Sequence, residues 1–153
     1  MAIRSTERIK TLTAVSAAGI RIKGMPSPDM FAMDREQVIR TFFHDPAVIE
    51  RELKVNLSPE QEAHMAANLM TAARLGWQPR FFNPKLRKWL RRIDVPTHIV
   101  WGDSDRVVAP AYAAEFNEAI AGSRVTMLKD SGHMLHMERP DQLAKAVAGF
   151  IGR

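Results

Sequence analysis

Apolar residues gather in three short runs that indicate buried strands, one near the start of the chain and two in its last third. The runs are KTLTAVSAAG over residues 10–19, THIVWG over 97–102 and RVTML over 124–128. Each run is short and gives way to glycine or to a turn-forming segment, which is typical of strands buried inside a sheet.

Helical patterns alternate with the two later strands. Residues 110–122 begin with proline and close with glycine, as helices commonly do. Pro140 then begins a last helix, whose apolar residues recur on one face. Those residues are Leu143, Val147, Phe150 and Ile151. This alternation predicts right-handed parallel crossovers, and so an α/β fold with a short, mostly parallel sheet of about three strands.

The segment between the first and second strands is helical and, at about 75 residues, too long for a simple crossover. Capping-box patterns at 34–37 and 58–61 predict two helix starts. We expect Asp45-Pro46 to break the first helix and Gly76 to stop the second. The length and the helical pattern predict a lid inserted into the sheet domain.

The length and composition of the chain indicate a single domain without disulfides. The 153 residues are 46% hydrophobic and 25% charged, which is typical of a soluble globular chain. No apolar run approaches the ~20 residues of a membrane span, and the first residues lack the apolar stretch of a signal peptide. The absence of cysteine excludes thiolate metal sites and thiol catalysis. We therefore expect a cytoplasmic protein.

The net charge of +5 comes from one segment, residues 80–92. Removing its six cations from the 22 basic residues leaves 16 against 17 acidic ones. The cations, next to Trp89, could bind nucleic-acid phosphates. A solvated helical face over 80–93 is the favoured interpretation, since its apolar residues recur at helical spacing. The six cations are Arg80, Lys85, Arg87, Lys88, Arg91 and Arg92, and the apolar residues are Leu86, Trp89, Leu90 and Ile93.

Titratable side chains follow the last two strands. Asp103 and Asp105 come just after 97–102, and His133 follows 124–128 in the sequence Ser-Gly-His. The carboxyl ends of neighbouring parallel strands share one crevice, so an aspartate and this histidine can form a hydrogen-bonded pair there. Acid before histidine also fits the hydrolase order of serine, acid, histidine. The alternative is a histidine that only caps a turn.

The stretches IDVPTHIVWGDSDRVVAP and DSGHMLHMERPDQLAKAVAGFI together resemble the closing third of α/β-hydrolase fold enzymes. The shared features are Val-Pro before a strand, Gly-x-x-Asp after it, then Gly-His and Glu-x-Pro before the last helix. The resemblance implies that Asp105 is the triad acid and His133 the general base, with no cofactor. It places Asp103 and His136 at variable positions, which indicates structural roles.

The same resemblance extends over most of the chain. RIKTLTAVSAAGIRIKG looks like the sixth strand of the family. It implies a partial hydrolase core over 1–24 and 93–153, with a helical cap over 25–92.

The Gly-x-Ser-x-Gly elbow that carries the family's nucleophile is missing. None of the eight glycines frames one, and Ser16, Ser104 and Ser131 do not lie on such a motif. The glycine-rich oxyanion loop is absent too. The resemblance therefore implies that the nucleophile and oxyanion hole precede residue 1. We expect the C-terminal portion of an esterase-like serine hydrolase, inactive alone and acting on a small apolar ester-like substrate once completed.

Other functions stay open at this level. The chain could be a non-catalytic module that binds a small apolar ligand or a partner. A basic nucleic-acid binder is a further alternative. The two histidines of residues 133–136 lack a third ligand, so we expect no metal. An uncovered strand at residues 10–16 would need a partner, and we expect a homodimer or a complementing N-terminal fragment there. No contact with a membrane is expected.

Overall fold

A computed structural model describes residues 2–79 and 81–152; Met1, Arg80 and Arg153 lie outside the described residues. Its centre is a parallel sheet of three strands in the order β1-β2-β3. The strands are β1 (Leu12–Val15), β2 (Thr97–Gly102) and β3 (Arg124–Leu128). The predicted α/β class with a short parallel sheet is confirmed.

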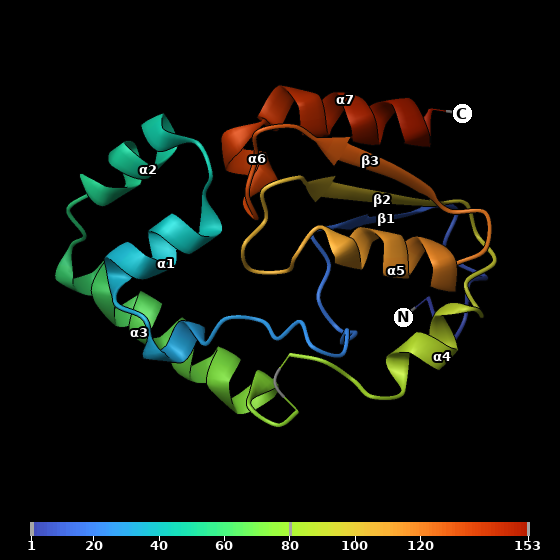
Figure 1. Cartoon of the computed structure of the whole chain (residues 1–153), viewed down its shortest axis with the longest axis horizontal. Helices are drawn as coiled ribbons and strands as arrows, with labels where there is room; N and C mark the ends of the chain where they lie inside the picture. The colour runs from blue at the N-terminus through green and yellow to red at the C-terminus, as the bar shows by residue number, and fades with distance from the viewer. Residues whose placement is uncertain (1, 80, 153) are drawn as a thin grey trace.

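Helices surround the sheet on both faces and at one end. In Figure 1, α5 and α7 cover opposite faces, and the strand arrowheads point toward α6 and the pair α1 and α2. The helices are η1 (Met30–Ala32), α1 (Arg35–Phe42), α2 (Pro46–Leu53), α3 (Pro59–Gly76), α4 (Leu86–Leu90), α5 (Ala111–Ala119), α6 (Leu135–Glu138) and α7 (Pro140–Ile151).

The core forms around β2, which is buried along its whole length. Ile99 and Trp101 pack into one apolar cluster with Phe116 of α5. Val100 belongs to a second cluster, with Leu128 and Leu135. Alternate strand residues point to opposite faces, so the two clusters lie on the two sides of the sheet. The central strand, with a neighbour on each side, is the rigid base of the loop that follows it.

The first strand is shorter than predicted: it covers residues 12–15, not 10–19. The chain leaves the strand because Ser16 has φ 42° and Gly19 has φ 122°, both in the left-handed region. β1 is an edge of the sheet, and its Val15 side chain is 38% exposed. An edge strand with an exposed apolar side chain is the feature for which we expected a partner.

Both predicted capping boxes are present. Asp34 and Gln37 cap α1, and Ser58 and Gln61 cap α3. Asp45-Pro46 does more than interrupt α1, because Asp45 accepts a hydrogen bond from the amide of Ala47 and begins α2.

The predicted end of the second helix at Gly76 is confirmed. Gly76 is the last helical residue of α3, and any Cβ there would collide with the Phe81 ring. Close packing therefore explains this glycine, not a left-handed cap.

The basic segment forms a shorter helix than predicted, Leu86–Leu90 in place of 80–93. Pro84 disfavours helical backbone at residue 83, and the Asn83 side chain instead accepts from the amide of Lys85. Leu90 and Ile93 are buried in the core, as the favoured interpretation requires. Arg87 pairs with Glu115 and Glu118 of α5.

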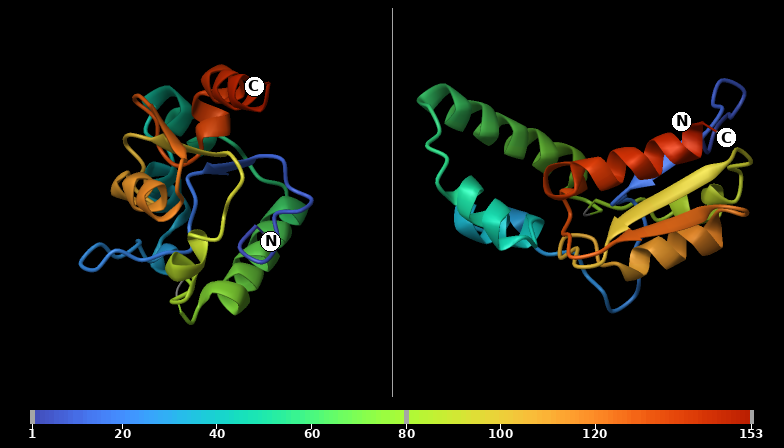
Figure 2. Two further views of the ribbon diagram at one scale, coloured as in Figure 1. Left: turned by 90° about the vertical axis from the view of Figure 1, so that its right-hand side faces the viewer. Right: turned by 90° about the horizontal axis from the view of Figure 1, so that it is seen from above.

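In both views of Figure 2, α3 extends away from the sheet. About half of the Met65, Leu69 and Met70 surface is exposed. The division into a core and a 25–92 cap stays a prediction. Within residues 2–79 and 81–152, no helix is long and apolar enough to cross a membrane.

Candidate active site

The turn after β2 encloses one carboxylate completely. The side chain of Asp105 has no exposed surface. Its Oδ1 accepts hydrogen bonds from the amides of Val107 and Val108, at 2.8 and 2.9 Å. Trp101 Nε1 in turn donates to the carbonyl oxygen of Val108 at 2.9 Å, which ties this turn to the buried strand. Two backbone donors hold the carboxylate in one orientation and leave Oδ2 for another partner.

That partner is the imidazole of His133. Its Nδ1 lies 2.9 Å from Asp105 Oδ2, which is the short distance we expected between the two side chains. A carboxylate can only accept, so Nδ1 carries a proton and Nε2 is left as the basic nitrogen of a neutral ring. The ring is 20% exposed and packs edge-on against Phe42, with centroids 5.4 Å apart. The pair therefore has the geometry of the acid and base of a triad.

The two loops that carry this pair touch through their backbones. The amide of Ser104 donates to the carbonyl oxygen of Ser131, at 3.0 Å. Gly102 lies directly against the same loop, and any Cβ there would collide with the carbonyl oxygens of Ser131 and Gly132. This glycine is needed for the close approach of the histidine loop to the end of β2.

Asp103 and His136 lie outside the pair. Asp103 is exposed and accepts from the Ser104 hydroxyl at 2.9 Å. The small loss of contact with water at the Asp103 carboxyl group would by itself raise its pKa. Hydrogen bonds from Ser104 and from the Asp130 and Ser131 backbone, with the charge of His44, outweigh it and hold that pKa below 3.8. His136 is exposed on α6. A structural role for both stays a prediction.

Glu138 is a buried carboxylate that sequence reasoning did not select. It is 6% exposed, on the last turn of α6. Three backbone amides donate to it, those of His44, Asp45 and Gly132. The signal in the sequence was the Glu-x-Pro motif, which we interpreted as a mark of the family and not as a contact.

The neighbouring Arg139 binds the same turn. Its Nη1 donates to Asp45 Oδ2 at 2.9 Å, and its Nη2 to the Asp130 carbonyl oxygen at 2.7 Å. The hydrogen bond from Arg139, followed by that from the Ala47 amide, lowers the pKa of Asp45 from its ordinary value of 3.8.

We expect Asp45→Asn to lower the free energy of unfolding at pH 7 but not in strong acid. A carboxyl whose pKa is lowered by folding stabilises the protein above its unfolded pKa, near 3.8, and loses this effect as the pH falls through its folded pKa. Urea titrations at pH 7 and at low pH measure the difference, with exposed Asp94→Asn as control. Equal losses at both pH values would contradict the prediction.

None of the three serine hydroxyls near the strand ends contacts the imidazole within the described ranges. Ser104 donates to Asp103, and Ser131 Oγ donates to the Leu128 carbonyl oxygen at 2.9 Å. Ser16 is buried, and its Oγ has no hydrogen-bond partner. The nucleophile that the pair would need is therefore not supplied by these side chains.

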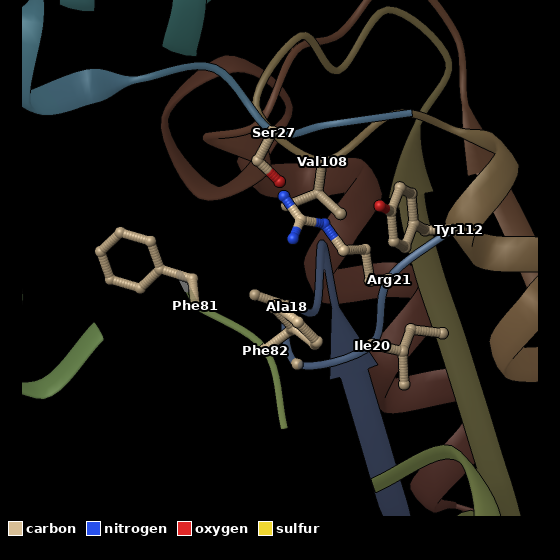
Figure 3. Close-up of a pocket in the computed structure, with 9 residues that line it drawn as sticks. Ala18, Ile20, Arg21, Ser27, Phe81, Phe82, Val108 and Tyr112 are labelled. Atoms are coloured by element: carbon tan, nitrogen blue, oxygen red, sulfur yellow. The ribbon is translucent and has the colours of Figure 1, made fainter. Parts of the chain in front are cut away.

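A small hollow lies beside the acid turn, between the end of β1 and α5 (Figure 3). Its volume is about 20 Å³, which is room for about one water molecule. In Figure 3 the guanidinium of Arg21 points toward Ser27. The hollow is lined by Ala18, Gly19, Ile20, Arg21, Ser27, Phe81, Phe82, Val108 and Tyr112. It is too small to hold a substrate. Among the described residues, no group of three or more His, Cys, Asp or Glu side chains could hold a metal ion.

The sequence that forms this site matches a known protein family. The profile described as alpha/beta hydrolase fold matches residues 31–140, which include both members of the pair. The chain belongs to the α/β-hydrolase fold family.

Curated relatives match part of the chain. Monoacylglycerol lipase ABHD6 of Bos taurus is 38% identical over 66 residues, 43% of this chain and 20% of that protein. The 2-hydroxy-6-oxononadienedioate/2-hydroxy-6-oxononatrienedioate hydrolase of Klebsiella pneumoniae is 35% identical over 72 residues, 47% of this chain and 24% of that one. The alignments therefore cover a quarter or less of these two relatives.

Solved structures match the whole fold. A serine hydrolase involved in carbazole degradation superposes with a TM-score of 0.69 at 21% identity, over 99% of this chain and 57% of that one. A membrane phospholipase A gives 0.73 at 22% identity, over 99% and 51%. The chain therefore corresponds to little more than half of each of these two structures.

Proposed function

We propose that Asp105 and His133 are the acid and the general base of a serine hydrolase site, whose nucleophile and oxyanion hole come from outside these 153 residues. The 2.9 Å contact between Nδ1 and the enclosed carboxylate carries this proposal. In such a site Nε2 takes the proton of the serine hydroxyl as its oxygen attacks the carbonyl carbon. The imidazolium, stabilised by Asp105, then returns the proton to the leaving group.

The substrate class we propose is a small apolar ester or a related compound. The names of curated relatives refer to a monoacylglycerol, to dienedioates and trienedioates, and to an epoxide, so the family alone does not choose the substrate. We also propose a cytoplasmic location, supported by the lack of cysteine, and a cap formed by residues 25–92.

The missing groups would bind at the open edge of β1. The amides of Leu12 and Ser16 donate to Pro96 and Val100 on the β2 side, so those of Thr13 and Val15 point away from the sheet. An edge of this kind is a template for another strand. We propose residues 10–16 as the binding surface for a complementing segment that carries the serine elbow, with a second copy of the chain as the alternative occupant.

We expect the chain alone to hydrolyse p-nitrophenyl acetate no faster than free imidazole, because it contains no Gly-x-Ser-x-Gly elbow. Addition of a family segment that carries the elbow and the oxyanion loop should raise the rate. Thr13→Pro should block this rise, because it removes an outward-pointing donor and spares the β2 pairing. Turnover by the chain alone, abolished in His133→Ala and accompanied by an acylated serine, would refute the proposal.

A further inference from the structure

The carboxylate of Glu138 is held by backbone donors from two distant segments. Oε1 accepts from the amides of His44 and Asp45, at 2.6 and 2.8 Å, and Oε2 from the amide of Gly132, at 2.6 Å. The first two amides belong to the α1–α2 turn, residues 42–45, and the third directly precedes His133. All three partners are donors, which suits an ionised carboxylate, a group that only accepts.

Further contacts join the same two segments. The amide of His133 donates to the carbonyl oxygen of Phe42, at 2.8 Å. A Cβ at Gly132 would lie 2.7 Å from that oxygen and 2.9 Å from the amide nitrogen of His44, so the backbones are in direct contact. The α1–α2 turn therefore supplies both an anchor for the histidine backbone and, through Phe42, a wall for its ring.

We propose that Glu138 is a positioning residue that couples the α1–α2 turn to His133. While the Glu138 carboxylate holds both segments, the imidazole faces Asp105. When the α1–α2 turn moves away from the histidine loop, Glu138 loses two of its hydrogen-bond donors, and the loop loses the carbonyl oxygen of Phe42. The placement of helices α1 and α2 thereby controls whether the base is in position. The coupling matters for catalysis only through the proposed function, since it acts on the proposed general base.

Glu138→Gln tests the coupling, because an amide group must turn its nitrogen toward at least one of the three N–H donors and lose that hydrogen bond. We expect hydrogen exchange of the His44, Asp45, Gly132 and His133 amides to accelerate by at least about tenfold. The NMR signal of the His133 Nδ1 proton should broaden as well. Glu62→Gln, an exposed substitution in the first turn of α3, is the matched control and should change neither signal.

Two outcomes would overturn the coupling. In the Gln variant, faster exchange at Gly132 alone, with an unchanged His133 ring signal, would mean that Glu138 supports only its own loop. If the variant does not fold, the unsubstituted chain provides the test. Its protection factors for the four amides should agree within about threefold, as expected for amides that open together as one unit. Widely different protection factors would refute the coupling. Neither measurement uses an ester, so failure of complementation would refute the proposed function and leave the coupling standing.

Discussion

Gly102→Ala should destabilise the chain by about 3 kcal/mol, the upper part of the range for side chains forced into a packed site. The added methyl group would meet the carbonyl oxygens of Ser131 and Gly132, which are backbone atoms and cannot rotate away. The histidine loop would have to separate from the end of β2, and the hydrogen bond from the Ser104 amide to Ser131 would break with it. Urea denaturation at pH 7 measures the loss.

Gly149→Ala is the matched control for this substitution. Gly149 lies within α7, and a Cβ there would meet nothing within 4 Å. Alanine is the better helix former, so this variant should be more stable by about 0.5–1 kcal/mol. If both glycines tolerate alanine equally, then the two loops of the site are not packed as tightly as we describe.

The elements that were predicted well are those whose signals are local. The capping boxes of α1 and α3 involve residues three positions apart, and the apolar runs of β2 and β3 lie within single strands. Such patterns fix a helix start or a strand without help from distant residues.

The misplaced ends are those of β1 and of the basic helix. β1 ends at Val15, before the left-handed backbone of Ser16, and α4 begins only at Leu86, after Pro84. The candidate site divides into residues with a local signal and residues without one. Asp105 and His133 are themselves part of recognisable motifs, whereas the partners of Glu138 are 94, 93 and 6 positions away. The Glu-x-Pro motif indicated a glutamate before the last helix, but it did not indicate which groups Glu138 binds.

Asp105→Ala should lower the free energy of unfolding by about 3 kcal/mol at pH 7, because it leaves the amides of Val107 and Val108 without an acceptor inside the protein. Asp105→Asn should cost about 1 kcal/mol or less, because the side-chain oxygen can still accept from both amides. The difference between the two variants measures how much of the role of Asp105 is structural. Urea titrations provide both numbers, and equal losses would contradict the hydrogen-bond arrangement.

The asparagine variant also isolates the chemical role. Its amide nitrogen would face Nδ1 of His133 and donate to it, so the ring would carry its proton on Nε2 and lose its basic nitrogen on the exposed side. The ¹⁵N chemical shifts of His133 distinguish the two tautomers in the chain alone: we expect protonated Nδ1 in the unsubstituted chain and protonated Nε2 in Asp105→Asn. In a complemented hydrolase the same substitution should lower kcat by about 10⁴-fold. An unchanged tautomer would mean that Asp105 does not orient the ring, and Asp105 could not then be the acid of a triad.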